Sequence, residues 1–174
     1  MRALSAHRAA AAMLLAVVTV TGCTAEFAPA EVSELTLVET KSPVQLLQNE
    51  AASRLSATAV VSGVETVDSS IACRTVEDDP AGRFRQWQST TAISAAGSLA
   101  IARDLSASFV AEDWSARESA NDADAFRAVL SKPSSTASIH LDADGSHLEI
   151  WVNGPCVETD GADSDEVTSL EHLN

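Results

Sequence analysis

The segment 136–152 constrains the fold most, because its side chains alternate between apolar and polar on both sides of a turn. A dipeptide typical of hairpin turns, Asp144-Gly145, separates the two arms. The apolar members of the arms are Ile139, Leu141, Leu148, Ile150 and Val152. With Asp144-Gly145 as a two-residue loop, Leu141 lies opposite Leu148. One face of the hairpin is then apolar and must be covered, which predicts an antiparallel sheet with a second layer on one side.

The opposite face of this hairpin is polar and carries His140, Asp142, His147 and Glu149. In the predicted register His140 faces Glu149, and Asp142 faces His147, at cross-strand contact distance. Two imidazoles and two carboxylates can bind zinc or copper, so one interpretation is a metal-binding or enzymatic face. The other is a solvated outer face, and this is favoured because exposed faces of antiparallel sheets are normally polar. We therefore predict no metal and no catalytic residue, and keep these four as candidates.

The aromatic content is low, with three tryptophans, four phenylalanines and no tyrosine. Trp151 has the parity of the polar face, so it is the candidate for an exposed anchor of the kind that carbohydrate and peptidoglycan binders use, although a tryptophan partly covered by a neighbouring loop is the commoner outcome. Trp87 and Trp114 are predicted to lie in the core.

Two segments have helical patterns. The sequence Ser42-Pro43-Val44-Gln45 has a capping residue, a proline suited to the first turn and a capping-box glutamine, and Gly63 is a plausible stop. The apolar stripe that follows is Leu47, Ala51, Leu55 and Ala59. We expect helices over 43–61 and 98–113, the second from two adjacent apolar rows at i+4 spacing.

Further strands are expected around two other signals. The sequence Asp79-Pro80-Ala81-Gly82 fits a type I turn, with strands at 70–77 and 83–93 on either side. The segment 121–132 fits a short helix or a strand, and the strand, ended by Pro133, is slightly favoured. The fold class predicted is α+β, with two helices packed on one face of a small, mainly antiparallel sheet.

The N-terminus has the layout of a secretory signal: basic residues, an apolar run over 9–20, and a small residue before Cys23. Its residues 20–23, Val-Thr-Gly-Cys, resemble the lipobox of bacterial lipoproteins at all four positions. The resemblance implies diacylglyceryl transfer to the Cys23 thiol and cleavage after Gly22. A transmembrane anchor would need about 20 apolar residues, more than this run offers.

The resemblance predicts how the chain is organised. Residues 1–22 are the signal peptide, 23–41 the acylated cysteine and a tether, 42–157 one α+β domain, and 158–174 an acidic tail that is either mobile or a weak helix. The protein is expected on the extracytoplasmic face of the cell membrane, held by palmitate-type acyl chains. Nine arginines against two lysines, with abundant alanine, are similar to proteins of high-GC bacteria such as actinobacteria.

The net charge limits the kinds of molecule that the protein can bind, and the cysteine content indicates how the cysteines are used. The formal net charge is −14, and loss of Arg2 and Arg8 with the signal peptide takes it to −16. Such a surface is repelled by nucleic acid and by anionic lipid. With Cys23 assigned to lipid, Cys73 and Cys156 remain, and outside the cytoplasm a disulfide is the simplest use of them. A metal or catalytic cysteine pair is disfavoured because no CxxC spacing is present.

The chain lacks the common catalytic and nucleotide-binding signatures GxSxG, HExxH, GxxxxGK, GxGxxG and SxxK. The sequence therefore predicts a membrane-anchored, non-catalytic accessory or binding lipoprotein without cofactor. Its partners would be membrane lipid through Cys23 and an unidentified extracytoplasmic protein or small ligand. The alternative is a metal-binding or enzymatic lipoprotein that uses the polar hairpin face. A solute-binding component of a transporter usually needs two lobes, for which 152 mature residues are too few.

Overall fold

The computed structural model describes residues 32–56, 62–73, 79–119 and 124–171. The elements in chain order are α1 (Leu37–Ser56), β1 (Ser62–Ala72), β2 (Phe84–Ser94), α2 (Ser98–Val110), β3 (Ser115–Ser119), β4 (Phe126–Ser131), β5 (Ser138–Ala143), β6 (His147–Asn153), β7 (Val157–Glu158) and α3 (Asp165–Glu171). The predicted signal peptide and Cys23 lie outside the described residues.

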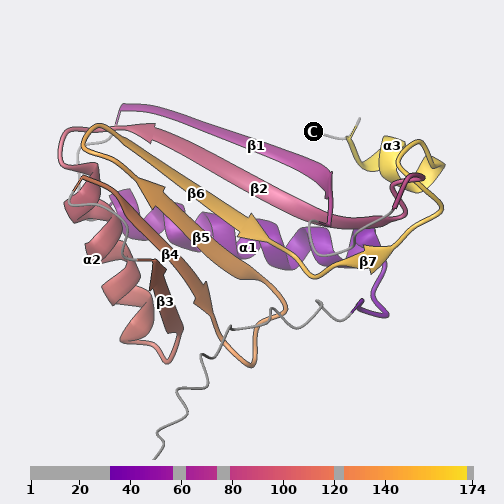
Figure 1. Ribbon diagram of the computed structural model, residues 1–174, viewed down its shortest axis with the longest axis horizontal. Helices are drawn as coiled ribbons and strands as arrows, with labels where there is room; N and C mark the ends of the chain where they lie inside the picture. The colour runs from indigo at the N-terminus through magenta and orange to yellow at the C-terminus, as the bar shows by residue number, and fades with distance from the viewer. Residues whose placement is uncertain (1–31, 57–61, 74–78, 120–123, 172–174) are drawn as a thin grey trace, which may run out of the picture.

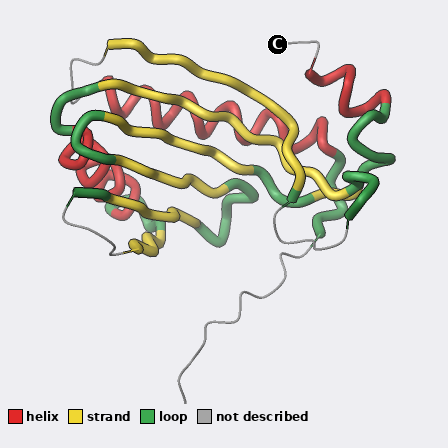
Figure 2. Tube along the Cα trace, turned by 45° about the horizontal axis from the view of Figure 1, so that its top comes forward, coloured by secondary structure: helices red, strands yellow, loops and turns green. Residues whose placement is uncertain are grey.

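The strands form one antiparallel sheet in the order β1-β2-β6-β5-β4-β3, and the short β7 also pairs with β2. After β2 the chain passes through α2 to β3 at the far edge, and then returns strand by strand to β6. Both α1 and α2 lie on the same side of the sheet, behind the strands as they are drawn in Figure 1 and Figure 2. The predicted α+β class, with two helices on one face, is confirmed; α3 is a further short helix.

The core lies between the sheet and the two helices. Inward side chains alternate along β4, β5 and β6 with outward polar ones, as the hairpin pattern predicts. The largest fully buried side chains are Trp87, Phe109, Leu37, Ile93, Leu130, Ile139, Leu141, Leu148, Ile150, Val44, Val152 and Val157. Phe109 meets Trp114 edge to face, with ring centroids 5.4 Å apart. The predicted core positions of Trp87 and Trp114 are therefore confirmed.

The layer between α1 and the β1–β2 pair also contains polar contacts beside its apolar side chains. Gln45 Nε2 donates to Asp68 Oδ2 over 2.7 Å, and Gln48 Nε2 donates to Thr91 Oγ1. Thr66 and Thr91 also share a hydrogen bond of 2.9 Å. The inward positions of β1 carry small or polar side chains, so hydrogen bonds and the ladder with β2 hold this edge strand in place.

Helix α1 begins six residues before its predicted start. The first-turn pair is Thr36 and Glu39: the Thr36 N–H donates to Glu39 Oε2 over 2.8 Å, and the Glu39 N–H to Thr36 Oγ1 over 3.3 Å. This capping box takes the place of the one expected at Ser42, and Pro43 lies inside the helix. The stripe positions Leu47, Ala51 and Leu55 are buried as predicted, whereas Ala59 and the predicted end near 61 lie outside the described residues.

The predicted tether boundary at residue 41 is wrong, because the chain joins the domain by Ser33. The Ser33 N–H donates to the Cys156 carbonyl over 2.8 Å, and Ser33 forms a parallel bridge with Val157. Residues 33–41 thus belong to the folded domain.

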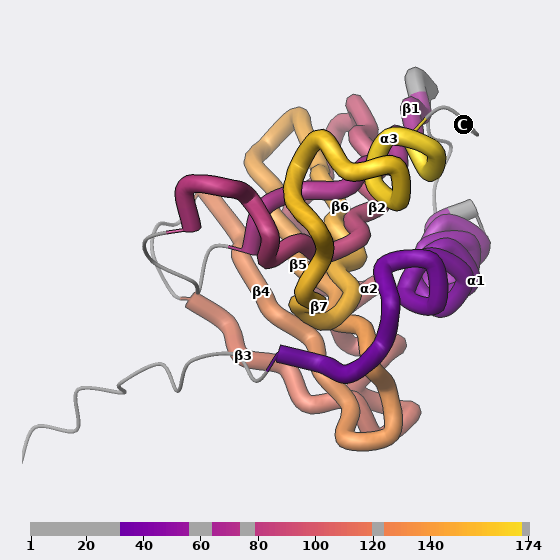
Figure 3. The backbone as a smooth tube through the Cα atoms, turned by 90° about the vertical axis from the view of Figure 1, so that its right-hand side faces the viewer, coloured from indigo at the N-terminus to yellow at the C-terminus, as the bar shows by residue number. Residues whose placement is uncertain are grey.

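The acidic segment after residue 157 is also part of the domain. Of its two predicted alternatives, the terminal helix is the one observed: α3 buries Val167 and Leu170. Glu166 Oε1 accepts a 3.1 Å hydrogen bond from the Leu37 N–H, which links α3 to the first turn of α1. Figure 3 shows α3 beside the sheet near β1.

The remaining predictions have mixed outcomes. The turn at 79–82 is present, since the Gly82 N–H donates to the Asp79 carbonyl over 3.1 Å. Its first strand is β1, which ends at Ala72; residues 74–78 lie outside the described part of the chain. Gly63 lies in β1 and ends no helix. The segment 126–131 is a strand, as favoured, whereas β3, with all its residues exposed, was not predicted.

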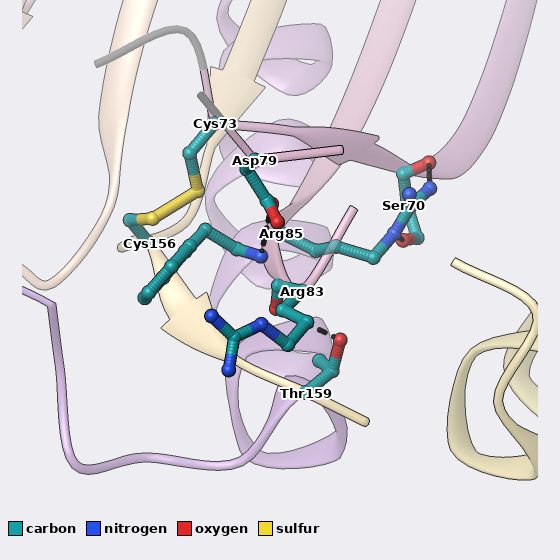
Figure 4. The surroundings of a disulfide bond; sticks show 8 residues. Ser70, Cys73, Asp79, Arg83, Arg85, Cys156 and Thr159 are labelled. Carbon is teal, nitrogen blue, oxygen red and sulfur yellow. Dashed lines mark hydrogen bonds between the residues drawn. A yellow bond between two sulfur atoms is a disulfide. The ribbon is translucent and has the colours of Figure 1, made fainter. Parts of the chain in front are cut away.

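The predicted disulfide between Cys73 and Cys156 is present, with Cα atoms 5.9 Å apart (Figure 4). It joins the end of β1 to the segment after β6, across a sequence separation of 83 residues. The Cys73 N–H donates to the Phe84 carbonyl over 2.9 Å. The Ser33 N–H also donates to the Cys156 carbonyl. These bonds hold together, at one end of the sheet, segments that are far apart in the sequence.

Replacement of both Cys73 and Cys156 by serine should lower the free energy of unfolding by roughly 2–5 kcal/mol, because the unfolded chain regains the freedom of a long loop. Denaturant unfolding of wild type, with and without reductant, and of the double variant measures this. Reductant should leave the double variant unchanged. An unchanged midpoint for reduced wild type would contradict the prediction.

Candidate functional site

None of the helices that the structure describes lies on the side of the sheet opposite α1 and α2 (Figure 2), and we call this side the open face. Its surface is formed by the outward side chains of β1 to β6 and contains two adjoining hollows. The larger hollow, of about 890 Å³, is lined by Ile71, Ala72, Gln86, Gln88, Ser131, Ser135, Thr136, Ala137, Ser138, His140, Trp151, Asn153, Gly154, Pro155 and Cys156. The smaller hollow, of about 420 Å³, is lined by Arg117, Glu118, Ser119, Arg127, Ala128, Val129, His140, Leu141, Asp142 and Trp151.

His140 and Trp151 line both hollows, so they stand at the boundary between them. The sheet places them there because Trp151 on β6 pairs with His140 on β5 and with Thr90 on β2. Both side chains are half-buried. The predicted parity of Trp151 with the polar face is therefore correct.

The larger hollow is shaped by hydrogen bonds between its own lining residues. Gln88 Nε2 donates to Asn153 Oδ1 over 2.7 Å, and Ser138 Oγ lies 3.3 Å from His140 Nε2. At one end the Gly154 N–H donates to the Trp87 carbonyl over 2.9 Å. A Cβ atom at Gly154 would lie 3.2 Å from a methyl group of Val44, so a larger residue would push this end of β6 away from α1.

The loop between β4 and β5 forms another wall of the larger hollow. The Ser135 N–H donates to the Lys132 carbonyl over 2.9 Å, which closes a turn. Ser135 Oγ donates to the Ala137 carbonyl over 2.9 Å. These bonds hold the loop in a defined position against the disulfide side of the hollow.

The smaller hollow contains an ion pair. Arg127 Nε on β4 donates to Asp142 Oδ2 on β5 over 2.8 Å, between residues that are direct cross-strand partners. Both side chains are partly exposed to solvent, so the pair contributes little to stability, on the order of 0–1 kcal/mol. The pair gives this hollow a charged wall, and no such wall is present among the described lining residues of the larger hollow.

The predicted register of the β5–β6 hairpin is wrong by two residues. Ala143 pairs with Leu148 and Leu141 with Ile150, so the turn residues are Gly145 and Ser146. Asp144 causes the difference, because its Oδ1 accepts 2.7 Å hydrogen bonds from the N–H groups of Ser146 and His147. A shift of two residues keeps every side chain on its predicted face.

The corrected register changes the neighbours of the four polar candidates. His140 lies opposite Trp151 instead of Glu149, and Asp142 lies opposite Glu149 instead of His147. Asp142 has Arg127 as its ion-pair partner, and His147 is exposed at the turn end of the hairpin. Across 32–56, 62–73, 79–119 and 124–171, no three His, Cys, Asp or Glu side chains are arranged to hold a metal ion.

The sequence reasoning missed the amide and hydroxyl residues of the larger hollow, above all Gln86, Gln88 and Asn153. A signal for two of them was present, since Gln86 and Gln88 flank the apolar Trp87 and must point away from the core. The contribution of the 131–138 loop depends on the position of β4 beside β5 and has no local sequence signal.

None of the helices in the described part of the chain has the length and apolar character needed to cross a membrane. Comparisons with protein-family models, with curated proteins and with solved structures each gave no match. The geometry of the open face is therefore the basis for assigning a function.

Asp144 gives the hairpin a pH-dependent component of stability. The backbone N–H groups of Ser146 and His147 hold the pKa of Asp144 below its ordinary value. A lowered pKa stabilises the fold above the unfolded-state pKa, about 4, and this contribution is lost as the pH falls through the folded-state pKa. The difference in free energy of unfolding between wild type and Asp144→Asn should be constant from pH 7 to pH 5 and change below about pH 4.

Denaturant unfolding of both proteins at each pH measures that difference. Asp160→Asn, a substitution at an exposed carboxylate, controls for the removal of one negative charge. A difference between wild type and Asp144→Asn that stays the same at pH 7 and pH 2.5 would show that Asp144 does not set this dependence.

Proposed function

We propose that this protein is a membrane-anchored, extracytoplasmic, non-catalytic binding lipoprotein whose ligand site is the larger hollow of the open face. The observation that supports the proposal is the larger hollow, which has His140 and Trp151 at its boundary with the smaller hollow and lies on a sheet face that no described helix covers. Its volume of about 890 Å³ falls within the range of roughly 300–1,000 Å³ common for small-molecule sites. Aromatic, amide and hydroxyl side chains meet there, which is the mixture typical of ligand sites.

The arrangement favours binding over catalysis. A general base or a nucleophile needs a partner that activates it. In the larger hollow the described pair closest to such an arrangement is Ser138 with His140, residues on the same strand whose polar atoms lie 3.3 Å apart, and no Asp or Glu is among the described lining residues. Two observations weaken the metal-binding alternative. In the corrected register His147 does not face Asp142, and Asp142 forms an ion pair with Arg127.

The anchoring part of the proposal has a geometric consequence. The lipobox would attach lipid at Cys23, and the chain enters the domain at Ser33, ten residues later. Ten residues span at most about 36 Å, so the domain would stay close to the bilayer surface. Ser33 bonds to Cys156, a lining residue of the larger hollow. The tether would therefore join the domain at the rim of the proposed site.

Substitution of Cys23 by alanine should abolish lipid attachment and leave an unprocessed or mislocalised precursor, because the thiol that accepts the diacylglyceryl group is gone. Metabolic labelling with a fatty-acid probe and cell fractionation measure the effect. Cys73→Ala serves as the matched control, since it removes a cysteine and should retain the label. Equal labelling of the Cys23→Ala variant and wild type would contradict the proposal.

A fragment screen tests the binding site and needs no assumption about the identity of the ligand. The probes are small neutral, cationic, anionic and aromatic compounds, added to the full-length processed protein in phosphatidylcholine nanodiscs. Saturation-transfer NMR should detect several binders, and Trp151→Ala should weaken most of them about tenfold or more, since tryptophan truncations at binding hot spots have costs of this size.

Empty nanodiscs and the Glu149→Gln variant are the controls; Glu149 lies on the same strand but lines neither hollow. Binding of no fragment, or binding that is insensitive to Trp151→Ala, would show that the open face is not the ligand site.

A further inference from the structure

We propose that the larger hollow binds an uncharged saccharide; this inference rests on the function proposed above and gives its ligand class. The first observation is electrostatic. Charged residues make up 21 % of the chain, yet among the lining residues that the structure describes for the larger hollow there is no Asp, Glu, Lys or Arg. Of these described lining residues, His140 is the one that titrates, since Cys156 is in the disulfide. The smaller hollow, on the same face, contains Arg117, Glu118, Arg127 and Asp142.

The lack of formal charge in the lining disfavours an ionic ligand. An ion that leaves water needs a partner of opposite charge, or it loses more solvation energy than it regains. An anionic ligand would also be opposed by the net charge of −14. The larger hollow is therefore suited to a ligand without formal charge.

The polar lining disfavours a purely apolar ligand. Gln86, Gln88 and Asn153 contribute amides, and the 131–138 loop contributes hydroxyls. Within the described residues, the 2.7 Å bond between Gln88 and Asn153 uses the carbonyl oxygen of Asn153, so its amide hydrogens remain for a ligand. An apolar ligand would cover these groups without replacing their hydrogen bonds to water, which opposes its binding.

Trp151 supplies the surface on which a sugar ring can lie. Its side chain is half-buried, so it is supported by its neighbours and still lines both hollows. The C–H face of a sugar ring packs on an aromatic ring, while the equatorial hydroxyls point sideways to amides and hydroxyls that both donate and accept. The arrangement of Trp151 beside Gln86, Gln88 and Asn153 offers both kinds of contact in one hollow.

A neutral peptide is the closest competitor, because amides also bind peptide groups. Extended peptides usually bind by adding a strand to a sheet edge. The faces of β2, β6 and β5 form most of the floor of the larger hollow, and each of these strands is already paired on both sides; the edge strand β1 contributes only Ile71 and Ala72 at its end. Strand addition over this floor is therefore closed to a peptide, and side-chain recognition of hydroxyls favours the saccharide.

The test is a titration of the full-length processed protein in phosphatidylcholine nanodiscs with maltotriose, triacetylchitotriose and a neutral acetylated tripeptide amide. Tryptophan fluorescence and saturation-transfer NMR give the dissociation constants. We expect at least one saccharide to bind and the peptide to bind at least tenfold more weakly. Trp151→Ala and Gln86→Ala should each weaken saccharide binding about tenfold or more, whereas Trp151→Phe should recover most of it.

Arg127→Gln is the matched control, because Arg127 lines the smaller hollow and does not line the larger one. Its loss should leave the saccharide affinity unchanged. Near-ultraviolet circular dichroism shows that each variant is folded, and Gln86→Ala keeps the test valid if Trp151→Ala does not fold. Absence of saccharide binding, preferred peptide binding, or saccharide binding insensitive to both variants would overturn the proposal. Fragments that still bind in a Trp151-dependent way would then leave the broader binding function standing.

Discussion

The pairing of β2 with β6 is the interaction on which the rest of the structure depends. β2 belongs to the N-terminal pair of strands and β6 to the C-terminal meander, so this ladder joins the two halves of the chain. On the open face, this ladder pairs Thr90 of β2 with Trp151 of β6. It also pairs Gln88 with Asn153, and both of these residues line the larger hollow. Two further features stabilise the same junction. The disulfide between Cys73 and Cys156 lies at its end, and Trp87 is buried on its core side.

The two faces of the sheet have opposite character because the strand period is two. On one face apolar side chains are covered by α1 and α2, with polar contacts beside them where α1 crosses β1 and β2. On the other face the strands leave polar side chains in contact with solvent. A polar face needs no cover to be stable, so the absence of any described helix there is consistent with the sequence. The hollows are more specific, because they require a shaped loop, the disulfide segment and a tryptophan in a polar row.

Local periodicity predicted the hairpin faces, the second helix, the core tryptophans and the polar face on which Trp151 lies, because these depend on parity alone. The cysteine pair was predictable from the number of cysteines left after Cys23. The exact register of the β5–β6 hairpin was not predictable, because it depends on hydrogen bonds from the N–H groups of Ser146 and His147 to the Asp144 carboxylate. Likewise, Thr36 and Glu39 capped α1 ahead of the equally plausible signal at Ser42. The strand order and the lining of the larger hollow depend on long-range pairing, for which a single sequence carries no local signal.

Charge and recognition are carried by different surfaces of this domain. Carboxylates are concentrated on the C-terminal segment from Glu158 to Glu171, which packs near the start of α1. Their field is screened over about 8–10 Å at physiological ionic strength, so it acts mainly on the local surface. A neutral ligand experiences little of this field, and its affinity for the larger hollow would depend on hydrogen bonds and ring packing. Under the proposed anchoring, a short tether would then hold the domain beside an anionic membrane while the site retained its selectivity, because repulsion and recognition act through different groups.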